Sequence, residues 1–423
     1  MTNRTIAPQI NNITHISVPK IEKYTLGNGL PVYTINGSSS PIVKLELFFQ
    51  AGRYFETKPL VSALTAGMLN KGTSNKTAFE IVKKIDFYGA HISFSANTYT
   101  ASITISCLKE YLGEILAILE EILLDATFPE EEFVQLRERA IQKLKINQLK
   151  NGYIASKHFN AALFGKNHPC GYLTTEETYR NIQIEDVKDY YKSHFSFQDF
   201  SFLIAAGNID KDVITCIDKK LSSIPVNQNF VTEQKTFSPE KNKTQEIKIA
   251  DSVQASIRVG KTLFDVHHPD YKEINILNTV LGGYFGSRLM SNIREEKGYT
   301  YGIYSFISPI IDTSYFCIAT DVGLAHKEAT LHEISYEINR LKNEAVGQEE
   351  LDMVKNYLAG QLMKSVDGSM KIASTLRQMI IFGQDINDIN EDLRVIQDVS
   401  AEQLMQLANK YLDMNEMYKV VAA

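Results

Sequence analysis

The chain presents one order of expected elements twice, at an offset of about 210 residues, and this repeat constrains the fold more than any other feature. In the first half the strand-like run IVKLELFFQAG precedes helical patterns near 59–69 and 78–88. The strand-like runs HISFSANTY and ASITISCL follow, and then two long amphipathic helices. Gly89, a plausible helix C-cap, corresponds to Gly298 in the second half. An offset of this size is the length of one domain, so two homologous domains are predicted.

The second half carries the same elements in the same order. QASIRVGKTLF reads as its strand, and YKEINILNTVLGG and GSRLMSNIREEKG as its two helices. YTYGIYSFIS and TSYFCIATDV are the next strands, followed by two long helices. Strands mixed with helices predict an α+β class, in which each domain has a mixed, mainly antiparallel sheet with helices packed on one face.

The join between the halves is polar, carries two prolines and lacks periodicity, so it is read as a linker. The predicted organisation is an N-terminal domain over 20–225, a linker over 226–246 and a C-terminal domain over 247–423.

Composition narrows the class of protein. The chain has 423 residues, 44% hydrophobic and 22% charged, which is ordinary for globular proteins. A net charge of −6 without a basic patch argues against a nucleic-acid partner. No apolar run approaches about 18 residues, so no membrane-spanning helix is expected. The N-terminal segment lacks the apolar centre of a secretory signal, which predicts a cytoplasmic protein.

Metal ligands and nucleophiles are not arranged in any recognisable pattern. The four cysteines lie far apart without Cys-x-x-Cys spacing and are expected to be free, buried thiols. None of the nine histidines stands in His-x-x-Glu-His or its inverse. There is no Gly-x-Ser-x-Gly elbow and no phosphate-binding glycine loop. The sequence therefore predicts neither a metal site nor catalytic residues in this chain.

One segment, SRLMSNIREEKGYTYGIYS, does suggest a binding site. Arg294 lies near the end of an expected helix, Gly298 stops that helix, and Tyr301 falls on the next strand. A helix-end Arg and a strand-start Tyr can converge across such a break, offering a cation and a hydroxyl donor to a peptide carbonyl or an oxyanion. The alternative from physical chemistry alone is an exposed Arg and a packed Tyr.

These residues resemble the C-terminal domain motif of the pitrilysin/insulinase-type zinc metallopeptidases, a family that includes the mitochondrial processing peptidase. LGGYFGSRLMSNIREEKGYTYGIYS stands in register with that motif, and the resemblance runs from about Ile21 to the end of the chain. It implies that Arg294 and Tyr301 bind substrate next to a zinc ion.

The first half resembles the zinc-binding segment of the same family. QAGRYF leads into the segment and KGT follows it, but the family's His-x-x-Glu-His is replaced by ALTAG. Ala63 and Gly67 stand in place of the histidines, and Ala66 in place of the glutamate that acts on the zinc-bound water. The family's third ligand, a Glu further along, falls on Leu144 or Lys145. Neither is a carboxylate, so no zinc is expected in this chain.

In some members of this family, one subunit supplies the zinc motif and another the Arg/Tyr pair. The resemblance implies that this chain is the second type: a non-catalytic, peptide-binding subunit of a heterodimer whose homologous partner holds zinc. Four domains would enclose a chamber in which a peptide lies extended against a strand edge. No membrane partner is implied, and a homodimer is possible when the chain is alone.

Two other interpretations remain open. The chain could be a structural or assembly protein on the same fold, although retention of Arg294 and Tyr301 argues against this. It could also be an enzyme with an unanticipated site, which metal analysis of the purified chain would reveal. The substrate, the cleavage preference and the identity of the partner are not contained in the sequence.

Overall fold

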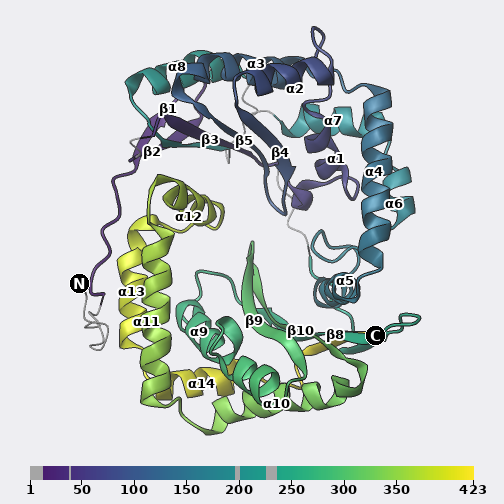
Figure 1. Ribbon diagram of the computed structural model, residues 1–423, viewed down its shortest axis with the longest axis vertical. Coiled ribbons are helices and arrows are strands. Elements are labelled where there is room, and N and C mark those ends of the chain that lie inside the picture. The colour runs from purple at the N-terminus through teal and green to yellow at the C-terminus, as the bar shows by residue number, and fades with distance from the viewer. Residues whose placement is uncertain (1–12, 38–39, 196–200, 225–235) are drawn as a thin grey trace, which may run out of the picture. The chain divides into compact units, whose positions relative to one another are not determined.

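A computed structural model describes residues 13–37, 40–195, 201–224 and 236–423 (Figure 1). The chain divides into two compact units, each assembled from separate stretches. We call Pro19–Arg258, Gly368–Ile381 and Tyr418–Ala423 the first unit. The second unit comprises Val259–Asp367, Phe382–Met417 and the described part of Met1–Val18.

The first unit is built on a six-stranded sheet of order β1-β2-β6-β3-β5-β4. Its strands are β1 (Glu22–Thr25), β2 (Pro31–Asn36), β3 (Ile42–Phe49), β4 (His91–Ala96), β5 (Ala101–Leu108) and β6 (Phe202–Gly207). β2 and β6 are parallel, and the other neighbours are antiparallel. The sheet is therefore mixed and mainly antiparallel, as the sequence predicts.

Among the residues that the structure describes, ten helices and helical turns of the first unit precede β7. They are η1 (Arg53–Phe55), α1 (Val61–Met68), α2 (Ala78–Phe87), η2 (Lys109–Tyr111), α3 (Leu112–Asp125), α4 (Glu130–Gln148), α5 (Asn151–Phe164), α6 (Glu176–Arg180), α7 (Ile184–His194) and α8 (Lys211–Leu221). α2 begins with a capping box, in which Thr77 and Glu80 each bond the other's backbone N–H. It ends before Gly89, whose φ of 59° is left-handed, as the expected C-cap requires.

The strand β6 is buried along its whole length, so both faces of the sheet are covered there. One cover comes from far along the chain: α12 (Ser369–Ile381) packs on β6 and β2. Phe48 of β3 and Phe202 of β6 stack with ring centroids 4.6 Å apart in this buried layer. The sequence analysis expected helices on one face of each sheet and did not assign α12 to the first sheet, because this helix lies in the second half of the sequence.

A second sheet has the order β7-β11-β8-β10-β9. Its strands are β7 (Thr244–Ile247), β8 (Gln254–Leu263), β9 (Thr300–Ile310), β10 (Thr313–Gly323) and β11 (Tyr418–Ala422). β9 and β10 form an antiparallel hairpin in the second unit, while β7 and β11 pair in parallel in the first. The boundary between the units falls within β8.

The helical elements of the second unit follow the order predicted for the second half. They are α9 (Tyr271–Asn278), η3 (Thr279–Gly283), η4 (Met290–Glu296), η5 (Leu324–His326), α10 (Lys327–Asn343), α11 (Gln348–Ser365), η6 (Ile386–Asp388), α13 (Ile389–Asp398) and α14 (Ala401–Tyr411). Together with the two sheets they confirm the α+β class.

Two sequence-based expectations meet the edge of what the structure describes. Residues 226–235 of the expected linker lie outside the described residues. β7 begins at Thr244, within the last three residues of the expected linker. The domain limits therefore stay predictions. Across the described ranges, no helix is long and apolar enough to cross a membrane.

Candidate functional site

The segment that replaces the zinc motif lies on α1, as the sequence predicts. Ala63 is exposed, Gly67 is half-buried and Ala66 is 2% exposed. Ala63 and Gly67 are four residues apart and share one face of the helix. Side chains of this kind offer no atom to a metal ion. In the part of the chain that the structure covers, no group of three or more His, Cys, Asp or Glu side chains could hold one.

The start of α1 is held by the half-buried carboxylate of Glu56. Its side chain accepts hydrogen bonds from the backbone N–H groups of Leu60 and Ser62, at 2.9 and 3.1 Å. It also accepts from the hydroxyls of Ser62 and Tyr172, at 2.5 and 3.3 Å. Burial raises the pKa of Glu56 above its ordinary value, against these hydrogen bonds. The start of α1 is therefore held by four hydrogen bonds, although the helix offers no metal ligand.

The structure places Leu136 of α4 opposite Gly67. A Cβ atom added at Gly67 would have its three nearest heavy atoms in Leu136, the first at 2.9 Å. Leu144, eight residues further along α4, is buried, and Lys145 pairs with Glu176 at 2.8 Å. The position counted along the sequence for the third ligand, Leu144 or Lys145, stays a prediction. Neither of these residues nor Leu136 carries a carboxylate.

Arg294 and Tyr301 lie where the sequence predicts, on either side of a helix-to-strand break. Arg294 belongs to η4, whose hydrogen bonds have π-helical spacing: Lys297 N–H donates to Asn292 O at 3.0 Å. Such segments are rare and are frequently found at functional sites. Gly298 has φ 67° and ends η4, and β9 begins at Thr300. Tyr301 is therefore the second residue of β9.

The side chains of this pair are accessible but are not joined to each other. The Arg294 guanidinium lies over the ring of Phe285, 4.6 Å from its centroid, and approaches Glu295 at 3.9 Å. Tyr301 is 98% exposed and Phe285 65%. Among the described residues, no hydrogen bond or ring contact links Arg294 to Tyr301. The sequence analysis did not single out Phe285. The available signal was its place between Gly283 and Gly286 in the motif.

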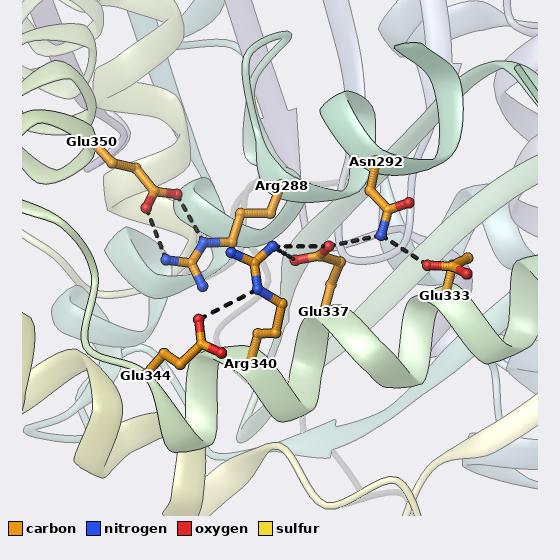
Figure 2. Close-up of polar contacts among 7 residues, drawn as sticks. All are labelled: Arg288, Asn292, Glu333, Glu337, Arg340, Glu344 and Glu350. Atoms are coloured by element: carbon orange, nitrogen blue, oxygen red, sulfur yellow. Dashed lines mark hydrogen bonds and ion pairs between the residues drawn. The ribbon is translucent and has the colours of Figure 1, made fainter. Parts of the chain in front are cut away.

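Polar contacts tie η4 and the residue Arg288 before it to the helices α10 and α11 (Figure 2). Arg288 binds Glu350 of α11 through two hydrogen bonds of 2.8 Å. Asn292 donates to Glu333 and Glu337 of α10, at 2.9 and 2.7 Å. These contacts fix the segment that presents Arg294, because Arg288 lies just before η4 and Asn292 lies within it.

Comparison with known proteins identifies the family. Residues 32–172 match the model described as insulinase, peptidase family M16, and residues 181–358 match the one described as peptidase M16 inactive domain. The two models together cover about three quarters of the chain. The chain belongs to the M16 peptidase family. The similarity to pitrilysin/insulinase-type peptidases inferred from the motifs is thereby confirmed.

Relatives of this M16 chain carry diverse names. A Bacillus subtilis protein named "Uncharacterized zinc protease YmxG" is 25% identical over 92% of this chain and 95% of its own length. The Helicobacter pylori "Non-peptidase homolog YmxG" is 23% identical, over 92% and 90%. The Arabidopsis thaliana "Probable mitochondrial-processing peptidase subunit beta" is 23% identical, over 96% and 79%. The names thus range from protease to non-peptidase within one family.

A solved structure confirms the M16 fold. The crystal structure of a peptidase M16 inactive domain from Pseudomonas fluorescens matches with a TM-score of 0.84. It is 24% identical and covers 95% of this chain and 98% of that one. At this identity the likeness shows the fold alone.

Proposed function

We propose that this chain is the non-catalytic, substrate-binding subunit of a heterodimeric zinc metallopeptidase that acts on peptides. The observation that carries the proposal is the contrast between the two motifs. The α1 segment has Ala63, Ala66 and Gly67 where the family places its ligands and base, whereas Arg294 and Tyr301 are retained and accessible. Zinc would be held by a homologous partner that keeps His-x-x-Glu-His.

The Arg294 side chain suits the binding of a peptide carbonyl. Guanidinium groups present several donors in a rigid plane, and the contact with Phe285 orients that plane without occupying a donor. The hydroxyl of Tyr301, on a nearly fully exposed side chain, is available to a ligand. A peptide would meet both groups next to the strand that carries Tyr301.

Edge strands offer the backbone partner that an extended peptide needs. β4 ends the order of the first sheet and β9 ends the order of the second. An extended peptide adds to such an edge through main-chain hydrogen bonds, which makes binding largely independent of its sequence. We place substrate binding at β9 because it also carries Tyr301.

The test combines this chain with a homologous chain that keeps the zinc motif and follows cleavage of a peptide. The partner alone is expected to be inactive, and the pair active. Arg294→Ala is expected to lower kcat/KM about a hundredfold, as for loss of one donor to a developing charge. Tyr301→Phe removes the hydroxyl and keeps the ring, so its effect on kcat/KM measures the contribution of the hydroxyl alone.

Arg394→Ala is the matched control. Arg394 is also a helical arginine of the second unit, with a 69% exposed side chain that pairs only with neighbouring Glu391 among the described ion pairs. Its loss should leave cleavage unchanged. Full activity of the partner alone, or an Arg294→Ala pair as active as the Arg394→Ala pair, would contradict the proposal.

The second candidate is a structural or assembly protein on the same fold with no role in proteolysis. The "non-peptidase" name of the Helicobacter pylori relative favours it. Stable binding to a protein that is not a peptidase, with no effect of Arg294→Ala on the complex, would support this candidate instead. We propose the cytoplasm as the location of either.

A further inference from the structure

Much of the outer edge of β9 is covered by the chain itself. In an antiparallel pair, every second residue points its N–H and its C=O away from the partner strand. Ile303 is such a residue, because its N–H donates to Met290 Sδ at 3.4 Å. Ser305 is the next one, because its O atom accepts from Asn278 Nδ2 at 3.4 Å. A Cβ added at Gly282 would lie 2.7 Å from Ser305 N, so η3 leaves no room for a second strand there.

The same alternation leaves Ile307 open. It is the next residue to face outward, and it lies opposite Phe316 of β10. Among the described residues, no hydrogen bond joins the N–H or the C=O of Ile307 to another segment. Pro309 follows at the next outward position, where a proline removes no hydrogen bond of the sheet. Between Ser305 and Pro309, the edge therefore offers one open N–H, that of Ile307.

A cavity of about 430 Å³ adjoins this open position. Besides β9, its walls come from α9, η3, α11 and α13, together with Gln384, all in the second unit. Cavities of this order are large enough to bind a ligand. The aliphatic part of the lining comprises Ile276, Ile307, Leu358, Leu362, Val395 and Ile396.

The lining carries no net charge. Its two charged residues, Lys272 of α9 and Asp392 of α13, pair with each other at 2.7 Å. The amide of Asn278 also lines the cavity, and its orientation is set because Ser305 O can only accept a hydrogen bond. Asn278 Oδ1 is then buried with no partner in the described part of the chain. A ligand that is uncharged here and brings a main-chain N–H would suit both features.

We propose that this cavity receives a large apolar side chain, such as Leu or Phe, of a peptide whose main chain pairs with Ile307. The inference rests on the proposed peptide-binding function and adds a preference to it. Main-chain pairing at a strand edge gives affinity, whereas a pocket for a side chain gives specificity. Ile307 lies six residues after Tyr301 on β9, which is about 20 Å along a strand. One peptide of moderate length can therefore meet both.

The test measures binding of labelled peptides to the whole chain by fluorescence anisotropy, without a partner and without zinc. Each peptide has about ten residues, enough to span from Tyr301 to the cavity. One central position is Leu, Ala or Lys in an otherwise uncharged sequence of Ser, Thr and Gly. The Leu peptide is expected to bind about tenfold tighter than the Ala peptide, as for methylene groups added in an apolar pocket. The Lys peptide probes Asp388 and Glu391, which lie near Lys272 outside the lining, and should bind no tighter than the Ala peptide.

Methylated peptides test the main-chain pairing. Successive N–H groups of an extended strand point to opposite sides, so only alternate ones can meet the edge of β9. The main-chain nitrogen of the Leu and that of the residue after it are methylated in separate peptides. Binding is expected to weaken about fivefold in one of them, as for loss of one hydrogen bond, and to stay unchanged in the other. Equal effects in the two peptides would contradict pairing at Ile307.

Leu362→Glu places a carboxylate in the lining and keeps a residue of high helix propensity. It is expected to abolish the preference for the Leu peptide over the Ala peptide, because an apolar side chain would then meet a charge. Met363→Glu is the matched control: Met363 is the next residue of α11, is 47% exposed and lies outside the lining. This variant should keep the tenfold preference. The Tm of each variant checks that it is folded, and the peptide series decides without either.

Equal binding of the Leu and Ala peptides, tighter binding of the Lys peptide, or an unaltered preference in folded Leu362→Glu would each overturn the proposal. These outcomes are distinct from those of the cleavage test, because neither zinc nor a partner takes part. A pair that cleaves peptides while this chain shows no preference for Leu would contradict the cavity alone. Leu-selective binding by a chain that supports no cleavage would contradict the heterodimeric peptidase alone.

Discussion

At the scale of the residue, the α1 segment that resembles the family's zinc-binding segment is held by hydrogen bonds, although Ala63, Ala66 and Gly67 offer no metal ligand. Glu56 still holds the start of α1 with four hydrogen bonds, one of them to Tyr172, more than a hundred residues away. The facing residue of α4 is Leu136, an apolar side chain against the bare backbone of Gly67. At Ala66, which is 2% exposed, a small apolar side chain avoids the cost of burying a polar group that no metal would satisfy.

This geometry predicts which substitutions restore a zinc site. Ala63→His, Ala66→Glu and Gly67→His return the helical ligands and the base, and Leu144→Glu supplies a carboxylate at the position that the resemblance gives for the third ligand. The fourfold variant is expected to bind about one zinc ion per chain, held by three protein ligands and water. The measurement is the metal content of the purified protein after zinc loading and gel filtration.

The control carries the same three changes on α1 and keeps Leu144. With only two protein ligands, this variant is expected to retain little zinc. Equal zinc contents in the two variants would show that residue 144 does not complete the site.

At the scale of the element, the break between η4 and β9 rests on one glycine. Gly298 has φ 67°, a left-handed conformation that costs other residues energy, and a Cβ there would meet nothing within 4 Å. Any effect of adding a side chain is therefore a backbone effect. Gly302, on β9, also has open space around it, but φ there is not in the left-handed range.

Gly298→Ala is expected to lower the free energy of unfolding by about 1 kcal/mol, from the left-handed conformation alone. Gly298→Asn should cost less, because Asn tolerates this region better. Gly302→Ala is the matched control and should change stability little. Urea unfolding of the three variants provides the measurement. A Gly298→Ala variant as stable as Gly302→Ala would mean that the turn does not require glycine.

The same elements show how far the sequence could lead. The break at Gly298, the end of α2 before Gly89 and the strands β4 and β5 follow from local patterns, and the prediction of each is confirmed. Contacts between distant segments were out of reach. No local signal tells that α12 packs on β6, that Leu136 faces Gly67, or that Phe285 underlies Arg294. Such pairings depend on how helices and strands meet in space, which periodicity does not encode.

At the scale of the whole molecule, the chain passes between the two units five times. α12 and β11 belong to the first unit, but the residues next to them in the sequence belong to the second unit. α12 packs on β6 and β2, and β11 pairs with β7 from Lys419 to Ala422. If the second unit unfolded alone, α12 and β11 would have to stay packed in the first unit while long disordered loops connect them to it. Closing such loops costs conformational entropy.

This connectivity predicts that the units unfold together, and the four free cysteines can report it. Cys107, Cys170 and Cys216 belong to the first unit and Cys317 to the second. Burial raises the pKa of the Cys107 and Cys170 thiols to about 11, and also raises the pKa of Cys216. The raised pKa disfavours the reactive thiolate while the protein is folded.

A short pulse of thiol labelling at urea concentrations across the unfolding transition should yield unlabelled and fourfold-labelled chains by mass spectrometry. Contrary to the expectation of four buried thiols, Cys170 and Cys216 are half-buried, so the double variant Cys170→Ser/Cys216→Ser serves as the control and should give none or two labels. A population of the unchanged chain with one label on Cys317, or with three labels that omit it, would show that one unit opens alone.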